Sequence, residues 1–440
     1  MNNYTRYLLV IAGLGGLLYG IDFGAIAAAM PYIKALKIFT DAQVSVIVGA
    51  VMFGGILSSL SAGVLCETLG RKKMIIAAAA MFLVAIPIVC LSAGSLPVML
   101  VGRVLQGMSA GYMAVVMPMY LTETLPADVR GRGTGIFQFF LWCGLVGAAL
   151  TGLAVAHFLG AFDSTEVSDA SKALAWKINF WWTMIPVALL FAGGFFLKES
   201  PVWLERKAKG GSDGTRTAPV REKGSLLRRK YVIPFLLAVA VLTLNKTMGM
   251  SSITSYAVVI FNKAGFTGQL GNFGDFAIKL VSMVTTLVAA SLVDRKGRTW
   301  LLKVGTAGMT VGLFSIGAVL LAVEKFGVAA TTASGCFCLV AFFVMEVFYS
   351  LGPGICVWLV LSELMPSRIR ANGMAIALFM NQLTAWGLAS SFLPWVNAWG
   401  WYSMFFFFAA NGALYFVVAC LIPETKGKSL EELEHLFDRK

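Results

Sequence analysis

Polar side chains interrupt three apolar stretches in the first half of the chain, at Asp22, Arg103, Gln106 and Gln138. Ionisable groups inside apolar helices are costly and are functional candidates by default. Arg103 is the natural partner of Asp22. If the arginine neutralises an ionised Asp22 in one conformation and withdraws in another, the carboxyl group binds and releases a proton. We therefore predict that Asp22 and Arg103 couple proton movement to the function, the alternative being a permanent ion pair.

A second set of polar side chains follows one stretch of the second half. Asn245, Gly249, Ser252 and Tyr256 recur at offsets of four, three and four, which places them on one face of a helix. Amides and hydroxyls on one face recognise hydroxylated molecules through directional hydrogen bonds. This face is the first candidate for a substrate site.

Lysines lie beside that face. Lys246 is adjacent to Asn245, and Lys279 follows Asp275 by four residues, in the acid-first order that suits an ion pair on a helix. Lys246 has two interpretations: Glu346 neutralises it, or its charge meets an anionic substrate such as a carboxylate. The sequence leaves both open.

Aromatic and amide side chains recur in two later apolar stretches. Aromatic planes beside hydrogen-bonding amides suit a ring with one apolar face, and the same residues also serve as packing. The members are Tyr349 and Trp358 in one stretch, which also contains the acid Glu346, and Asn381, Gln382 and Trp386 in the next.

Charged motifs between the apolar runs occur twice, once in each half of the chain. The segment from Glu123 to Arg130 returns as Glu363 to Arg370, the Glu67 and Arg71 pair returns as Asp294 and Arg298, and Glu199 returns as Glu424. The chain therefore consists of two related halves. Bare carboxylates avoid hydrocarbon, so these segments are loops on one membrane face. We predict that their ion pairs form a gating network that locks the halves together on that face, the alternative being that they only anchor helix ends.

Composition explains what must position these residues. The 440 residues are 58% hydrophobic and 13% charged, with a mean hydropathy of +0.80, which predicts a membrane protein. A spanning helix needs about 20 apolar residues. Twelve such runs predict an all-α protein of two six-helix bundles, at 7–30, 43–66, 74–93, 97–121, 134–158, 177–197, 232–261, 272–293, 300–323, 329–361, 373–397 and 402–422. The tenth run is expected to bend at Gly352-Pro353-Gly354.

Basic residues predict the orientation. Most of the 35 lysines and arginines lie in the even-numbered loops and at the two ends, so both termini are expected in the cytoplasm. The net charge of +13 follows from this topology, and no nucleic-acid partner is implied. We divide the chain into a first bundle (1–197), a cytoplasmic linker with short helices (198–231), a second bundle (232–422) and a cytoplasmic tail (423–440), in which Ser429 and Glu432 suggest a short helix.

Together these motifs resemble the sugar porter branch of the major facilitator superfamily over nearly the whole chain. The matching signatures are Gly63-x-x-x-Glu67-x-x-Gly70-Arg71-Lys72, Glu123 to Gly131, Glu199-Ser200-Pro201-Val202-Trp203-Leu204, Asp294-x-x-Gly297-Arg298, Gly352-Pro353-Gly354 with Trp358, Glu363 to Arg370, and Pro423-Glu424-Thr425-Lys426-Gly427. The resemblance implies the major facilitator fold, a central site near the midplane and alternating access.

The resemblance also implies roles for single residues. Gln138 matches a sugar-binding glutamine, Asp22 with Arg103 matches a pair associated with proton-linked members, and Trp358 and Asn381 match binding positions. The seventh span departs from the family pattern of two glutamines, Ser or Thr with Gly, and then Asn. The positions there are Asn245, Lys246, Met248, Gly249 and Ser251, and in the eleventh span Gln382 replaces a common Trp.

We therefore predict a proton-coupled symporter of a sugar, polyol or related hydroxylated molecule. Its predicted substrate residues are Gln138, Asn245, Lys246, Ser251, Ser252, Trp358, Asn381 and Gln382. The alternatives are an importer of an anion contacted by Lys246, a passive uniporter, and a non-transporting sensor. The seven cysteines and two histidines have no metal-ligand spacing. We expect no enzymatic activity, no metal and no cofactor besides the proton gradient, and a monomer in the plasma or inner membrane.

Overall fold

The computed structural model describes residues 3–125, 127–163, 167–208, 229–266, 269–365 and 370–424. The side chains of Arg130, Asp294 and Arg370 lie outside this description. The regular structure within it is helical. In chain order its helices are α1 (Asn3–Ala35), α2 (Asp41–Leu69), α3 (Arg71–Cys90), α4 (Leu96–Thr124), α5 (Ala127–Leu159), α6 (Asp169–Trp181), α7 (Met184–Gly194), α8 (Pro201–Ala208), α9 (Arg229–Thr247), α10 (Met250–Lys263), α11 (Leu270–Lys296), α12 (Arg298–Lys325), α13 (Thr332–Leu351), α14 (Pro353–Leu364), α15 (Arg370–Trp399) and α16 (Trp401–Leu421).

Twelve stretches of the described helices are long and apolar enough to cross a bilayer. Helices satisfy their own backbone groups, which hydrocarbon cannot do. The twelve predicted spans are therefore confirmed. The sixth begins at Asp169, eight residues before its predicted start, because the Ser168 hydroxyl accepts a hydrogen bond (3.2 Å) from the Ser171 backbone N–H and caps a polar first turn.

Three spans are each divided into two helices. The sixth span, Asp169–Gly194, is divided into α6 and α7 at Trp182-Thr183. The bend predicted at Gly352-Pro353 is present: α13 ends at Leu351 and α14 begins at Pro353, since proline lacks the N–H that would continue the helix. The seventh span, predicted as one helix over 232–261, is divided into α9 and α10. Gly249 lies between them in the left-handed conformation (φ 79°), which glycine adopts without a steric penalty.

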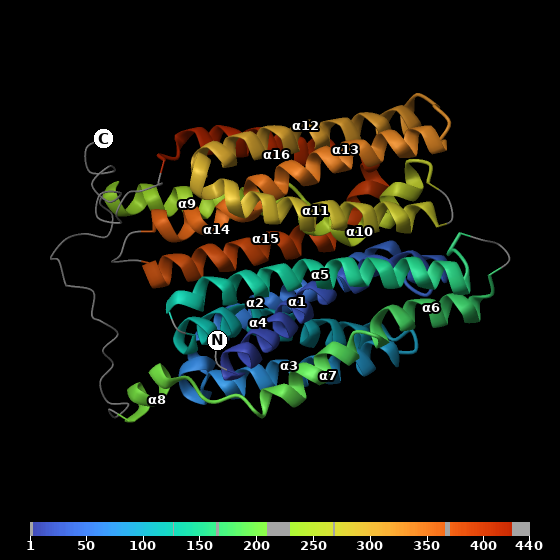
Figure 1. Ribbon diagram of the computed structural model, residues 1–440. Coiled ribbons are helices and arrows are strands. Elements are labelled where there is room, and N and C mark those ends of the chain that lie inside the picture. Colours follow the sequence, from blue (N-terminus) through green and yellow to red (C-terminus); the bar gives the residue numbers. More distant parts are fainter. Residues whose placement is uncertain are drawn as a thin grey trace.

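The helices form two groups, visible in Figure 1 as a blue-to-green bundle and a yellow-to-red bundle. Helices α1 to α7 pack among themselves, as do α9 to α16. Between the groups, α2 packs against α15, α5 against α11 and α1 against α10. The first turn of α1, the short helix α8 and the end of α16 lie at the same end of the molecule (Figure 1). We call this the terminal end.

Small residues set the closest approach inside the first bundle. A Cβ atom at Gly16 would overlap the Phe137 carbonyl of α5, and one at Gly20 would overlap the Leu141 carbonyl. The glycines therefore bring α1 and α5 into backbone contact. This packing fixes α1, which carries Asp22, beside α5, which carries Gln138.

Candidate functional site

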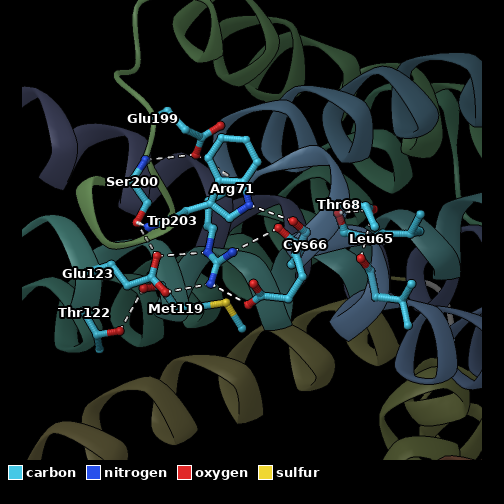
Figure 2. A network of polar contacts seen from close by, with 12 residues as sticks. Leu65, Cys66, Thr68, Arg71, Met119, Thr122, Glu123, Glu199, Ser200 and Trp203 are labelled. Carbon is cyan, nitrogen blue, oxygen red and sulfur yellow. Dashed lines mark hydrogen bonds and ion pairs between the residues drawn. The ribbon is translucent and has the colours of Figure 1, made fainter. Parts of the chain in front are cut away.

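A network of charged side chains holds the terminal end of the first bundle (Figure 2). The Arg71 guanidinium, 1% exposed, pairs with Glu67 (2.9 Å) and with both oxygens of Glu123 (2.9 Å each). It also donates to the Cys66 carbonyl (3.0 Å). Ser200 donates to Glu123. A buried arginine satisfied in this way holds α2, α3, α4 and α8 in one arrangement.

The second bundle repeats this arrangement with fewer contacts among the described side chains. The Arg298 guanidinium lies 3.4 Å from Glu363. Glu424 accepts hydrogen bonds from the backbone N–H groups of Arg298 (3.0 Å) and Thr299 (3.1 Å), as Glu199 accepts from Arg71 (2.9 Å) and Lys72 (3.0 Å). Each Glu thus caps the first turn of a helix.

These described pairs join loops within one bundle. Glu67, Arg71, Glu123 and Glu199 belong to the first bundle, and Arg298, Glu363 and Glu424 to the second. These contacts neither form nor exclude the predicted lock between the halves. Arg130, Asp294 and Arg370 were predicted in the same network and lie outside the described side chains. The gating role itself stays a prediction.

Contacts between the bundles gather at the opposite end. Asn397 donates to Asp41 (2.7 Å), and the Leu393 backbone N–H donates to Ser45 (3.0 Å). Nearby, Asn262 donates to Asp163 (3.3 Å). All of these residues lie on odd-numbered loops or on the adjoining helix ends. The two bundles are therefore joined at the end away from the termini.

A central cavity of about 190 Å³ lies between the bundles. Four predicted substrate residues line it: Gln138, Lys246, Ser251 and Trp358. The Lys246 ammonium donates to the Ser251 hydroxyl (3.2 Å). No ion pair joins Lys246 to a carboxylate among the described side chains. The interpretation that Glu346 neutralises Lys246 is thus not supported by these contacts, in which Glu346 accepts a hydrogen bond from Ser282.

A smaller cavity of about 110 Å³ adjoins the first and shares Tyr19, Phe23 and Trp358 with it. Asp22 and the predicted substrate residues Asn381 and Gln382 line this cavity. Trp358 is 50% exposed, which is high for a tryptophan in the middle of a bundle. It stands between the two cavities as a shared wall.

Two predicted substrate residues are elsewhere. Ser252 is buried and does not line either of the two cavities, and Asn245 packs against the Tyr349 hydroxyl. The prediction assumed one continuous helix over residues 245 to 256, whereas α9 ends at Thr247 and α10 begins at Met250. Ser251 and Thr254 line the cavity instead. Tyr256 stacks on Phe392 of its own bundle (centroids 4.6 Å apart), and its hydroxyl donates to Ser45 of the first bundle (3.4 Å).

Asp22 and Arg103 are neighbours without direct contact. Asp22 is fully buried, and neither carboxyl oxygen has a hydrogen-bond partner in the described part of the chain. Arg103 donates to Gln106 (2.6 Å) and the Ile47 carbonyl (3.4 Å), and it interacts with Asp22 electrostatically. The structure therefore shows Asp22 and Arg103 without a direct contact. The predicted coupling cycle includes one conformation of this kind, in which the arginine has withdrawn from the carboxyl group.

Sequence reasoning left several cavity residues out. Tyr19 lies one helical turn before Asp22, and Trp142 lies one turn after Gln138; the helical spacing alone would have found both. The buried Lys279 to Asp275 ion pair (2.7 Å) confirms the spacing argument, and both residues line the main cavity.

Comparisons with known proteins agree with this geometry. The family described as "Sugar (and other) transporter" matches residues 8–223 and 213–437. The arabinose-proton symporter of Bacillus subtilis is 27% identical over 97% of this chain and 93% of its own length. The galactose-proton symporter of Escherichia coli is 28% identical over 98% and 94%. A crystal structure of a D-xylose-proton symporter superimposes with a TM-score of 0.81 at 21% identity, covering 97% of this chain and 100% of that one.

Proposed function

Since the chain belongs to the sugar transporter family, the sugar porter branch of the major facilitator superfamily, we propose that it is a proton-coupled symporter of a sugar, polyol or related hydroxylated molecule. The main observation in support is the Asp22 carboxyl group, fully buried in a cavity wall with both oxygens unpartnered in the described structure. An ionised carboxylate without partners is very costly there. A proton on Asp22 removes that cost.

The substrate would occupy the central cavity between the bundles. Gln138 and Ser251 supply hydrogen-bonding groups, and Trp358 supplies an aromatic wall. While the bundles are joined at the end away from the termini, the substrate would enter and leave the cavity from the terminal end. Separation of Asp41 from Asn397 and of Ser45 from Leu393 would open the other end. Rocking of the two bundles about the cavity then exposes it to each side in turn.

The remaining features of the proposal concern topology and energy supply. The positive-inside rule supports cytoplasmic termini, with the terminal end of the molecule facing the cytoplasm of a plasma or inner membrane. The proton gradient is the energy source, so no bound cofactor is needed. A monomer suffices, because both bundles and both cavities come from one chain.

The test is uptake into proteoliposomes with a fixed set of probe compounds. We call the set of D-galactose, L-arabinose, D-xylose, D-glucose, D-gluconate and D-galacturonate the probe panel. At least one member should be accumulated with alkalinisation of the outer medium. Asp22→Asn should retain exchange of that compound and lose the part of the accumulation that the Asp22 proton drives. Transport of no member, or accumulation in Asp22→Asn that equals the native value, would contradict the proposal; uptake without accumulation in the native protein identifies a passive uniporter.

A second candidate, an anionic substrate, rests on Lys246. Its ammonium lies in the cavity wall, with the Ser251 hydroxyl as its observed polar contact. A substrate carboxylate placed between Lys246 and Ser251 would neutralise the Lys246 ammonium. The hydroxyl groups of the substrate would then hydrogen-bond to Gln138. Lysine in a desolvated pocket binds carboxylates through charge-assisted hydrogen bonds.

The variant Lys246→Gln separates the two candidates. An importer of sugar acids should lose about tenfold or more in affinity for D-gluconate or D-galacturonate, the cost of a charge-assisted bond of about 1.5 kcal/mol or more. A carrier of neutral sugars should keep its affinity for D-galactose or D-xylose within a few-fold. The matched control is Lys303→Gln, a basic residue of α12 that does not line the central cavity.

A further inference from the structure

A second buried carboxyl group lies in the other bundle. Glu346 occupies the middle of the span Thr332–Leu361, lines the central cavity and is 1% exposed. Its Oε1 atom accepts a hydrogen bond from the Ser282 hydroxyl. Its Oε2 atom is buried and has no hydrogen-bond partner in the described part of the chain. One half of this carboxyl group is therefore satisfied and the other half is not.

The charges around Glu346 come from one face of α11. Asp275, Lys279 and Ser282 follow at offsets of four and three, so they form one stripe. Lys279 pairs with Asp275 (2.7 Å), and both side chains are nearly inaccessible. Both act electrostatically on Glu346. Ser282 hydrogen-bonds to it directly.

Other elements around α13 offer no charge at this level among the described contacts. Helix α12 presents Gly308 and Gly312 against Phe348 and Met345. Helix α10 presents Phe261 against Phe342. On α13 itself, Tyr349 is a neutral phenol one turn away. Lys279 is thus the cation that both acids can use.

Charge balance then requires a proton. Asp275, Lys279 and Glu346 are two acids and one base in a membrane interior. With all three ionised, the cluster carries a net negative charge, and one carboxylate is left without a counter-charge. Such a state is strongly disfavoured away from water. The cluster is neutral only when the two carboxyl groups share one proton, and the unpartnered Oε2 atom of Glu346 is where that proton would reside.

Lys246 is the other cation at the cavity, and its observed polar contact is Ser251 on α10. An ion pair between Lys246 and Glu346 is not among the contacts of the described residues. Lys246 therefore leaves the local balance of the α11 cluster unchanged and remains available to the cavity.

The duplication places this group opposite the first coupling site. Glu346 follows Gln106 by the same 240 positions that separate Glu123 from Glu363. In the first bundle this position is Gln106, whose amide oxygen accepts a hydrogen bond from Arg103 (2.6 Å), the neighbour of Asp22. In the second bundle the corresponding residue is itself an acid. Each bundle thus has a buried carboxyl group at the wall of the central cavities.

We propose that Glu346, together with Ser282 and the Asp275–Lys279 pair, forms a second proton-binding site, independent of Asp22. The proton binds the Oε2 atom when the cavity admits water from one side. It leaves to water on the other side, where hydration and Lys279 stabilise the carboxylate. The inference rests on the proposed function in one respect: the second proton travels with the substrate, giving two protons per cycle.

Infrared spectroscopy of the full-length protein in liposomes tests the site without any substrate, with protons as the probe. The carboxyl C=O absorption distinguishes a protonated acid from a carboxylate. Across the pH range that the folded protein tolerates, the native protein should show two buried carboxyl groups that titrate. Asp22→Asn should remove one signal and Glu346→Gln the other. Gln keeps the acceptor for Ser282, so the variant is expected to fold, and its thermal unfolding is measured alongside.

The charge balance predicts opposite changes in the protonated carboxyl signal for two further variants. Asp275→Asn leaves Lys279 for Glu346 alone, so the protonated Glu346 signal should be lost at neutral pH. Lys279→Gln leaves two acids without a base, so an additional protonated carboxyl should appear. Asp169→Asn is the matched control: its side chain is 84% exposed, and the signals should stay as in the native protein.

Three results would overturn the site. The first is a native spectrum in Glu346→Gln. The second is a Glu346 signal that does not titrate. The third is a change of that signal in Lys246→Gln, which would make Lys246 its counter-ion. The measurement needs no transport, so failure of uptake and failure of the second proton site are distinguished.

Discussion

Glu199, at the end of the sixth span, caps helix α3 by accepting a hydrogen bond from the backbone N–H of Arg71 (2.9 Å). Gly70 makes this contact possible. Its φ of 92° is in the left-handed region, and a Cβ atom there would collide with the Glu199 carboxylate. The same geometry recurs in the second bundle at Gly297 (φ 93°) beside Glu424.

The variant Gly70→Ala should therefore be destabilised by about 1–3 kcal/mol, the cost of a strained backbone conformation. The lost cap adds to this cost. Thermal unfolding of the purified protein in detergent measures the effect. Gly63→Ala is the control, because a Cβ atom at Gly63 meets open space; equal melting temperatures for the two variants would contradict the role of Gly70.

The contact between Asp41 and Asn397 (2.7 Å) should hold the two bundles together at the end away from the termini. Asn397→Asp replaces a donor with a second carboxylate. We expect a shift of about 1 kcal/mol, roughly fivefold, toward the state open at that end, typical of an exposed polar pair. Spin labels on the variants Lys37→Cys and Trp399→Cys, both at exposed positions, measure the change as a longer distance between the two labels.

The exchanged pair Asp41→Asn with Asn397→Asp provides the control. It restores one donor and one acceptor with their positions reversed. The labels should return toward the native distance. A distance in Asn397→Asp that equals the native one would show that this contact does not bias the two states.

The sequence predicted the fold through long apolar runs and a duplicated set of charged loops. The twelve spans follow directly, because hydropathy reports burial in lipid whatever the packing partner. The bend at Gly352-Pro353 followed from proline chemistry. The break at Gly249 did not, because a single glycine in a helical run has many other uses.

The site was predictable residue by residue only where geometry is local. The Asp275 to Lys279 pair is set by one helical turn, so its spacing sufficed. The residues of α10 that face the cavity depend on the break at Gly249, and there Ser251 lines the cavity while Ser252 does not. Likewise, the pairing of Arg71 with Glu123 depends on how α2, α3 and α4 pack. The spacing of these residues along the sequence does not predict that packing.

Trp358, the shared wall of the two cavities, should contribute to substrate affinity. Trp358→Ala should raise the half-saturation concentration about tenfold for whichever probe-panel compound is transported, because an aromatic contact contributes up to about 1.5 kcal/mol. Trp358→Phe should stay within a few-fold of the native value. Trp399→Ala is the control, since Trp399 is 69% exposed at the far end of α15; an equal effect there would rule out a specific role of Trp358.

The steepness of accumulation with pH distinguishes one coupled proton from two. At zero membrane potential, a gradient of one pH unit is worth about 1.4 kcal/mol per proton, a factor of ten in the accumulation ratio. With Asp22 and Glu346 both carrying protons, the native protein should approach a hundredfold ratio for its transported probe-panel compound. Outside acid is the driving direction, so raising the external pH should abolish accumulation. Glu346→Gln should fall to about tenfold, because Asp22 still couples one proton. A native ratio that stays near tenfold would limit coupling to a single proton, while leaving Asp22 as its carrier.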